Sequence, residues 1–177
     1  MSETSIEHKA VAPKSLNFAL IVCSTSRSES LKRHERFRDP SGDLIVEKLK
    51  NNGHRVTVRR VVPDDRDVIQ KNLMRLLRSR KVDVIVTCGG TGVGPRDLTI
   101  EAVRPLLDKE IQGFGEIFRH LSYEEIGSAA VLTNALAAVA KGKVIFCIPG
   151  SPHAASLAVE KLILPEAGHI LKHAREA

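Results

Sequence analysis

The sequence predicts an α/β fold, a three-layer α/β/α sandwich whose mostly parallel sheet has an antiparallel edge strand. Short apolar runs such as 16–23 and 82–88 are nearly continuous, which is typical of strands buried on both faces. These runs alternate with stretches of helical periodicity, as expected for strand–helix–strand units. The 177 residues, 42% hydrophobic and 27% charged, suffice for one such domain.

The first half of the chain is expected to hold three strands and two helices. Strands are predicted at 16–23, 55–62 and 82–88, and helices at 43–52 and 67–80. The strand at 55–62 alternates valines with polar residues, which favours a place at the sheet edge. The intervening segment 24–42, rich in Arg, Lys, Glu and Ser, is expected to be a long polar loop.

The second half is expected to hold five helices and two strands. Helices are predicted at 99–107, 114–121, 127–136, 151–164 and 166–175, and strands at 137–140 and 143–148. Thr99 is expected to cap the first of these helices. Ser151 suits the N-cap of the fourth helix, with Pro152 in its first turn. Pro165 is expected to interrupt the helical pattern between the last two helices.

Residues 1–15 are predicted to be a flexible N-terminal extension and residues 16–177 a single domain. An apolar run of about 20 residues is missing from the sequence, so no membrane partner is expected. The first residues also lack the apolar core of a secretion signal, and a cytoplasmic location is expected.

The cysteines and histidines do not predict a metal or redox centre. Cys23, Cys88 and Cys147 lie in apolar stretches and are expected to be small buried residues. The histidines show no HxH, HExxH or mixed Cys/His spacing, which disfavours a zinc site. The net charge of +6 favours polyanions such as phosphorylated molecules. Aromatic residues make up only 3% of the chain, so few side chains are present on which nucleic-acid bases could stack. Nucleic acid is therefore not expected as a partner.

Glycine-rich and proline-rich turns follow the predicted strands. Gly89, Gly90, Thr91 and Gly92 come directly after a buried strand, and their backbone N–H groups could form a nest for an anion. A second such turn, Pro149 to Pro152, opens a helix whose positive end attracts phosphate. Because the carboxyl ends of parallel strands share one edge, ligands in such folds bind there.

Two aspartates stand at the same predicted edge. Asp64 follows the strand at 55–62, and Asp97 follows the glycine turn. Each could simply cap a helix. Alternatively, both could hold one Mg²⁺, which takes one or two carboxylates together with phosphate oxygens and water. The basic segment 27–38 is either a solvated loop or a lid over a polyanion.

Motifs in this order resemble the molybdenum cofactor biosynthesis family that includes the molybdopterin adenylyltransferases. The matching strings are Asp39-Pro-Ser41-Gly42, Pro63-Asp64-Asp65, Gly89-Gly-Thr-Gly92, Arg96-Asp-Leu-Thr99, Glu110-Ile-Gln-Gly113-Phe-Gly115-Glu116 and Pro149-Gly-Ser-Pro152. Ser122 to Gly127 resembles the B-type branch of that family. The resemblance covers nearly everything from Leu16 to Leu171.

The resemblance implies a molybdopterin-binding fold and transfer of AMP from ATP to molybdopterin, with pyrophosphate as the second product. It implies that Asp64 and Asp97 are catalytic and hold Mg²⁺. The substrate-binding residues that it implies are Ser24, Asp39, Ser41, Gly42, Gly89, Gly90, Thr91, Gly92, Thr99, Glu110, Gly113, Gly115, Pro149, Gly150 and Ser151. It further implies a homo-oligomer, trimeric or hexameric, and a hand-off of product to a molybdenum-inserting protein.

One departure from the family pattern concerns Thr133-Asn134, where the family commonly has a small polar residue followed by Arg. Without that guanidinium, an Arg or Lys of segment 27–38 would have to contact the phosphate instead. A non-catalytic molybdopterin-binding scaffold or carrier is the alternative function, and it would bind the pterin without releasing pyrophosphate. Whether molybdenum or tungsten enters the final cofactor is left open.

Overall fold

The computed structural model describes residues 13–176, so most of the predicted extension 1–15 lies outside the described residues. Six strands form one sheet in the order β2-β1-β3-β6-β5-β4. The strands are β1 (Asn17–Cys23), β2 (Arg55–Val62), β3 (Val84–Cys88), β4 (Lys109–Glu110), β5 (Leu136–Ala140) and β6 (Lys143–Ile148). The first four in spatial order are parallel, whereas β5 runs antiparallel to β6 and to β4. The predicted mostly parallel sheet with an antiparallel edge is confirmed.

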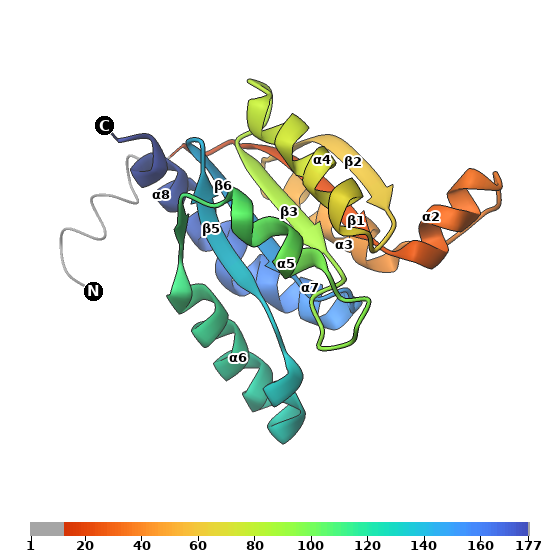
Figure 1. The fold of residues 1–177 in the computed structure, drawn as a ribbon. Helices are drawn as coiled ribbons and strands as arrows, with labels where there is room; N and C mark the ends of the chain where they lie inside the picture. The colour runs from red at the N-terminus through yellow and green to blue at the C-terminus, as the bar shows by residue number, and fades with distance from the viewer. Residues whose placement is uncertain (1–12, 177) are drawn as a thin grey trace.

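Helices cover both faces of the sheet (Figure 1). They are α2 (Thr25–Lys32), α3 (Pro40–Asn51), α4 (Arg66–Arg78), α5 (Thr99–Val103), α6 (Gln112–Ile126), α7 (Pro152–Ala158) and α8 (Leu164–Arg175), with the short 3-10 helices η1 (Arg104–Leu106) and η2 (Gly127–Leu132) and the π turn η3 (Val159–Ile163). Residues of α3, α6, α7 and α8 pack on one face, and residues of α4 and α5 pack on the other. None of the helices in residues 13–176 combines the length and apolar composition that crossing a bilayer demands.

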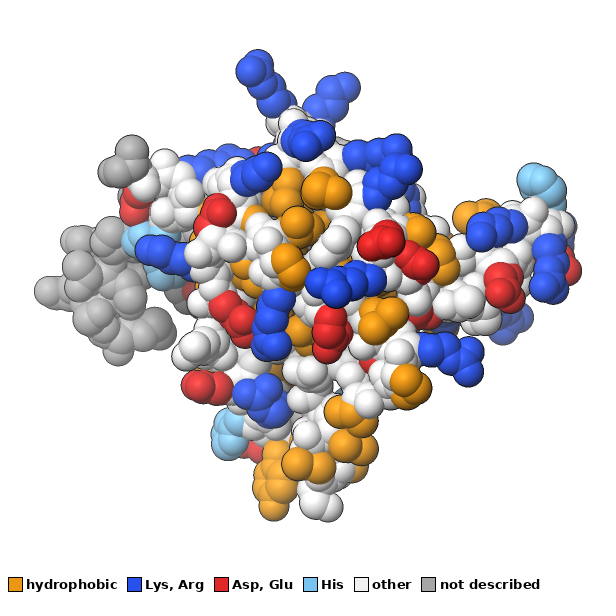
Figure 2. All heavy atoms as spheres, in the orientation of Figure 1, with side chains coloured by type: hydrophobic (Ala, Val, Ile, Leu, Met, Phe, Trp, Pro, Cys, Tyr) orange, Lys and Arg blue, Asp and Glu red, His pale blue; other side chains and the backbone are white. Residues whose placement is uncertain are grey.

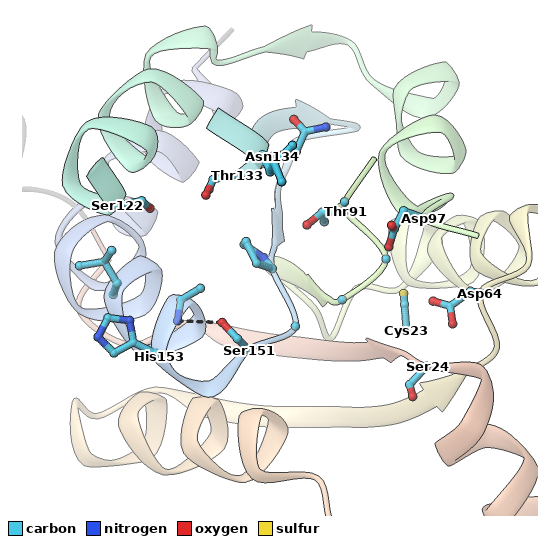
Figure 3. A pocket seen from close by; sticks show the side chains of 18 of the residues that line it. Cys23, Ser24, Asp64, Thr91, Asp97, Ser122, Thr133, Asn134, Ser151 and His153 are labelled. Atoms are coloured by element: carbon cyan, nitrogen blue, oxygen red, sulfur yellow. Dashed lines mark hydrogen bonds between the residues drawn. The ribbon is translucent and has the colours of Figure 1, made fainter. Parts of the chain in front are cut away.

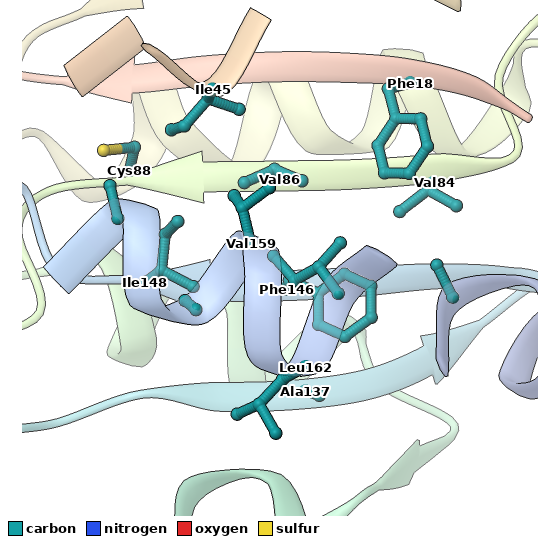
Figure 4. Close-up of a cluster of buried hydrophobic side chains, with 14 of the residues drawn as sticks. Phe18, Ile45, Val84, Val86, Cys88, Ala137, Phe146, Ile148, Val159 and Leu162 are labelled. Carbon is teal, nitrogen blue, oxygen red and sulfur yellow. The ribbon is translucent and has the colours of Figure 1, made fainter. Parts of the chain in front are cut away.

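The hydrophobic core follows from the alternation of side chains along buried strands. In β1, Phe18 and Leu20 join the cluster under α3 and α7, while Ala19 and Ile21 join the cluster under α4. Figure 4 shows the first cluster, with Phe18 and Phe146 among its large side chains. Because both faces are buried, the strand sequences are apolar at nearly every position, which makes these runs recognisable.

The segment 24–42 is not the long loop that its polar composition predicts. Residues Thr25–Lys32 form α2, whose N-cap Ser24 accepts a hydrogen bond from the backbone N–H of Arg27. The next helix begins at Pro40, earlier than the predicted residue 43, because the side chain of Asp39 caps it. Helix α2 buries little apolar surface, so it leaves no amphipathic pattern to detect, and it projects from the body of the molecule (Figure 1).

Three further elements differ from the prediction between residues 99 and 136. Thr99 does not cap α5, since Leu98 takes the N-cap position and Thr99 is the first helical residue. Helix α6 runs over Gln112–Ile126, longer than the predicted 114–121, and the two-residue strand β4 precedes it. The predicted helix 127–136 is a 3-10 helix that ends at Leu132, after which β5 begins at Leu136. The chain becomes a strand from Leu136 because β5 pairs with β6 along its whole length and gains hydrogen bonds there.

Pro165 does not interrupt the last helical segment, although proline lacks the N–H that an α-helix interior requires. The chain passes from α7 through the π turn Val159–Ile163 directly into α8, with Pro165 in the first turn of α8. A π turn changes the hydrogen-bond pattern just before the proline, so the helical path continues across it.

The strand register aligns the carboxyl ends of four parallel strands. Cys23 pairs with Val62, Val22 with Cys88, and Cys88 with Ile148. The residues that follow these strand ends therefore emerge side by side, at one edge of the sheet. This edge carries the turns that the sequence analysis singled out.

Candidate functional site

A cavity of about 710 Å³ opens at the carboxyl edge of β1, β2, β3 and β6. Figure 3 shows Asp64, Asp97 and Cys23 on one side of it and Ser122, Thr133 and His153 on the other. Ten of the predicted site residues line this cavity: Ser24, Asp64, Gly89, Gly90, Thr91, Gly92, Asp97, Pro149, Gly150 and Ser151. Turns far apart in the sequence thus meet around a single space.

The glycine turn after β3 forms one wall of the cavity. Gly90 has a φ of +64°, and a Cβ there would lie 2.5 Å from Oγ1 of Thr99 and 3.1 Å from Oδ1 of Asp64. Only glycine both adopts this backbone conformation readily and leaves room for those two side chains. A Cβ at Gly150 would lie 3.1 Å from Cα of Gly89, so the two turns touch each other.

Asp64 does not cap a helix. The neighbouring Asp65 is the N-cap of α4, accepting a hydrogen bond from the N–H of Val68 at 2.9 Å. Oδ2 of Asp64 accepts hydrogen bonds from the backbone N–H and the hydroxyl of Thr25 at 2.8 and 2.9 Å. Within residues 13–176, Oδ1 has no hydrogen-bond partner, and it is the oxygen nearest to the glycine turn. The side chain is thus fixed by one oxygen and available through the other.

Asp97 also uses one oxygen to hold its position. Its Oδ2 accepts a hydrogen bond from the N–H of Gly94 at 3.0 Å, and a Cβ at Gly92 would lie 2.6 Å from that oxygen. The adjoining helix α5 has no side-chain cap, so Asp97 is not its N-cap. Among the described residues, Oδ1 of Asp97 has no hydrogen-bond partner either.

The two carboxylates fit a magnesium ion by the chemistry of their donors. Each presents an oxygen that no described side chain or amide uses, and both line the same cavity. Among residues 13–176, no group of three or more His, Cys, Asp or Glu side chains converges to hold a metal. Mg²⁺ needs no such group, because it keeps waters and takes phosphate oxygens along with one or two carboxylates.

Asp39, Ser41 and Gly42 lie behind the cavity wall rather than in it. The hydroxyl of Ser41 donates a hydrogen bond to the carbonyl of Gly150 at 2.6 Å. Asp39 is only 4% exposed and accepts a hydrogen bond from Nη2 of Arg59 at 2.6 Å. These residues connect α3 to the turn after β6 and so support its position.

Two guanidinium groups line the cavity, and neither was among the predicted site residues. Arg96 belongs to the turn after β3, and Arg27 comes from α2. Nε of Arg27 donates to the carbonyl of Arg38 at 3.0 Å, and its Nη1 lies 3.8 Å from Oδ1 of Asp39. Arg27 belongs to the basic segment 27–38, for which the sequence allows either a solvated loop or a lid. The structure places Arg27 at the cavity.

The wall opposite the aspartates comes from α6, η2 and α7. Thr133 and Asn134 line the cavity here, and Asn134 is the residue at which the family resemblance led us to expect Arg. At the rim, Nδ1 of His153 lies 3.4 Å from Oε2 of Glu125. Of the segments in this wall, the sequence analysis assigned only the turn Pro149 to Pro152 to a site, whereas Ser122 to Gly127 indicated only the branch of the family. Spacing alone could not place either segment across from Asp64.

Four predicted site residues lie away from the main cavity. Thr99 is fully buried, and its hydroxyl donates to the carbonyl of Gly89 at 2.8 Å, which supports the glycine turn from beneath. Glu110 and Gly115 line a separate cavity of about 230 Å³, together with Arg104 and Arg119. Gly113 lies near the start of α6 with open space around it. Asn134 lines both cavities.

The cysteines are free, buried and protonated. Burial is the main reason why the pKa of Cys23 rises to about 12, with the negative charge of Asp64 adding to it and a hydrogen bond with Thr99 opposing it. Burial raises the pKa of Cys88 and Cys147 to about 12 as well. Although Cys23 lines the cavity, a neutral thiol is a poor nucleophile. The prediction that these residues are small and buried is confirmed.

Comparison with known proteins identifies relatives of this chain. Residues 19–169 match a family described as a probable molybdopterin binding domain. The chain is 48% identical over 165 residues to molybdenum cofactor biosynthesis protein B of Bacillus cereus, covering 93% of this chain and 94% of the relative. It is 44% identical over 174 residues to a molybdopterin adenylyltransferase of Pyrococcus furiosus, covering 96% and 98%.

Solved structures agree with this relationship. A crystal structure of a molybdenum cofactor biosynthesis protein B is 45% identical, with a TM-score of 0.82 and coverage of 92% of this chain and 98% of that one. The tungsten cofactor synthesizing protein MoaB from Pyrococcus furiosus is 43% identical, with a TM-score of 0.81 and coverage of 93% and 100%.

Proposed function

Because the chain belongs to the family of molybdopterin-binding domains found in molybdenum cofactor biosynthesis proteins, we propose that it transfers AMP from ATP to molybdopterin. The products are adenylated molybdopterin and pyrophosphate. Relatives named molybdopterin adenylyltransferase, 44% and 38% identical over nearly the whole chain, support this assignment. The observation that carries it is the pairing of Asp64 and Asp97 in one cavity with the glycine turn.

The bond changes of this reaction need no nucleophile from the protein. A terminal phosphate oxygen of molybdopterin forms a bond to the α-phosphorus of ATP, and the bond from that phosphorus to the bridging oxygen of the β-phosphate breaks. The protein must therefore hold two anionic groups together, which repel each other in water. Backbone N–H groups at Gly90 to Gly92 and at the start of α7 are suited to that role.

Mg²⁺ would be held by Asp64 and Asp97, and when bound it supplies charge neutralisation for the phosphates and the pyrophosphate leaving group. Thr25 and the N–H of Gly94 fix the two carboxylates before substrate arrives. This preorganisation limits the rearrangement needed when substrate binds.

Arg27 and Arg96 are proposed to contact substrate phosphates. Among residues 13–176, they are the arginines that line the cavity. Asn134 also lines it, at the position where the family resemblance leads us to expect a further arginine. The carboxylate of Asp39 forms an ion pair with Arg27, and this contact orients the Arg27 guanidinium. A planar guanidinium can donate two hydrogen bonds to one phosphate.

The wider setting of the reaction also belongs to this proposal. We infer a homo-oligomer, trimeric or hexameric, because large apolar side chains are exposed along α6 and η2. We also infer a cytoplasmic location, since three free thiols are typical of a reducing compartment. The adenylated product would pass to a molybdenum-inserting protein.

Incubation of the purified chain with molybdopterin, ATP and Mg²⁺ tests the activity. We expect adenylated pterin and pyrophosphate to form in equal amounts, and neither to form when Mg²⁺ is chelated. Tight pterin binding without pyrophosphate release would instead establish the non-catalytic scaffold or carrier. For a variant in which Asp64 is replaced by Asn, the matched control is Asp65→Asn. Asn caps a helix as well as Asp does, and Asp65 does not line the cavity.

A further inference from the structure

The two sides of the cavity that holds Asp64 and Asp97 differ in chemistry. The side with the aspartates also offers the backbone N–H groups of the glycine turn, which suit phosphates. The wall across from it includes the apolar side chains Ile126, Leu132 and Leu157. A phosphate gains nothing from apolar contacts, so this wall suits an uncharged and flat part of a substrate.

A carboxylate stands in this apolar wall. Glu125 lines the cavity, and its Oε2 lies 3.4 Å from Nδ1 of His153, which Figure 3 places across the cavity from Asp64. The side chain of Glu125 is 38% exposed. Within residues 13–176, neither of its oxygens accepts a hydrogen bond, so both can receive hydrogen bonds from a ligand.

Glu125 occupies a position that is unfavourable for its own helix. It is the next-to-last residue of α6, and the carboxyl end of a helix carries a partial negative charge. The last turn, Tyr123 to Ile126, contains no basic residue that would offset the charge of Glu125. A charge that destabilises its own helix is expected where a ligand requires it.

We propose that Glu125 binds the pterin ring of molybdopterin through the ring's 2-amino group and its N3–H, an inference that rests on the proposed function. These two donors lie side by side, like two N–H groups of a guanidinium, and one carboxylate accepts a hydrogen bond from each. The adenine of ATP instead presents an amino group beside the unprotonated ring nitrogen N1. A carboxylate only accepts hydrogen bonds, so it repels the lone pair of N1 and discriminates against adenine.

The apolar neighbours of Glu125 suit the flat faces of the pterin ring. Ile126 follows Glu125 on α6, while Leu132 and Leu157 come from η2 and α7. A ring whose polar edge contacts Glu125 can bury its faces against these side chains. A phosphate placed at the same wall would meet a negative charge and be repelled. The wall therefore selects the ring and also directs the phosphate of molybdopterin toward the aspartates.

Glu125→Gln tests this contact, because the amide keeps the shape of the side chain but replaces one acceptor by a donor. We expect the KM for molybdopterin to rise at least about tenfold and the KM for ATP to change less than about twofold. The matched control is Glu124→Gln, since Glu124 is 60% exposed, lies 3.4 Å from His120 and does not line the cavity. Equal KM values for molybdopterin in the two variants would overturn the inference and leave the proposed function intact.

Binding of two free pteridines, without ATP or Mg²⁺, tests the contact independently of catalysis. Pterin carries the 2-amino group, whereas lumazine carries an oxo group at that position. We expect the wild type to bind pterin at least about tenfold more tightly than lumazine, and Glu125→Gln to lose this preference. A wild type without the preference, or a variant that keeps it, would overturn the inference. A wild type that shows it but forms no pyrophosphate would support the inference and contradict adenylyl transfer.

Discussion

Asp64 and Asp65 are adjacent carboxylates in the turn after β2, yet their surroundings separate their roles. Asp65 accepts the N–H of Val68 and begins α4, while Asp64 contacts Thr25 and lines the cavity. Asp97 similarly holds the N–H of Gly94 through one oxygen. In each cavity aspartate, one oxygen is used for position and the other is left for a ligand.

Replacing Asp97 by Asn should lower kcat by at least tenfold, which corresponds to about 1.4 kcal/mol in the barrier. The amide can still accept the hydrogen bond from Gly94, so the turn keeps its shape, but the charge that favours Mg²⁺ is lost. Pyrophosphate release measured at saturating Mg²⁺ gives the rate, and pterin binding measured separately should change little. A rate within tenfold of wild type would contradict the assignment of Asp97.

Replacing Arg27 by Gln should raise KM for the phosphorylated substrates by about tenfold, because one charge-assisted hydrogen bond is lost. The same change at Arg33 is the matched control, since Arg33 follows α2 directly, is 66% exposed and contacts Glu29 instead of the cavity. Adding Asn134→Arg to the Arg27→Gln variant should recover part of the loss. Steady-state kinetics check both effects, and equal KM values for the Arg27 and Arg33 variants would show that Arg27 does not touch substrate.

At the scale of elements, Asp83 joins the beginning of β1 to the end of α8. Its Oδ2 accepts the N–H and the side-chain amide of Asn17 at 2.9 and 3.0 Å, and its Oδ1 pairs with Nη2 of Arg175 at 2.7 Å. Partial burial alone would raise the pKa of Asp83, but the hydrogen bonds from Asn17 and the ion pair with Arg175 outweigh it and lower the pKa.

Asp83→Asn should therefore reduce the free energy of unfolding at pH 7 by about 1 kcal/mol, a modest value because Arg175 is partly exposed. Since the folded-state pKa is depressed, this stabilisation is present above the usual value of 3.8 and is lost as the pH falls through the lower, folded-state value. Urea unfolding of both proteins across that range checks the sign. Glu47→Gln, exposed on α3, is the control. A difference that grows toward acid would contradict this account.

At the scale of the whole molecule, one surface is unusually apolar. Large side chains are exposed along α6 and η2: Ile117, Tyr123, Ile126, Val131 and Leu132. Figure 2 shows apolar side chains gathered at this lower end of the molecule. Ile126 and Leu132 also line the cavity that holds Asp64 and Asp97, so a second copy covering this surface would border that cavity. Exposed apolar patches of this kind mark interaction surfaces.

Val131→Asp should dissociate the proposed oligomer. Val131 is 82% exposed and does not line the cavity, so the monomer should still fold. An unpaired charge buried at an interface costs about 3 kcal/mol or more. Light scattering coupled to size-exclusion chromatography gives the mass. The control Met74→Asp, on exposed α4 surface, should remain a trimer or hexamer, and a wild type that elutes as a monomer would refute the proposal.

Sequence reasoning was accurate where the signal is local and apolar. The runs that became β1, β3 and β6 were recognisable because every position in them except Asn17 is buried. It was inaccurate where polar residues form a helix, as in α2, or where a two-residue strand exists only through its pairing partner, as in β4. Both kinds of error arise because tertiary contacts outweigh local propensity.

The sequence by itself determined the α/β fold class, the turns at the strand ends and the candidate aspartates, since apolar periodicity, glycine and proline act on neighbouring residues. The tertiary structure decided which carboxylate of the pair after β2 faces the cavity, that Arg27 reaches it, and that Glu125 lines its opposite wall. These depend on strand register, on the placement of β1 between β2 and β3, and on side-chain orientation. Sheet order is a non-local property, fixed only when distant segments bury their apolar faces together.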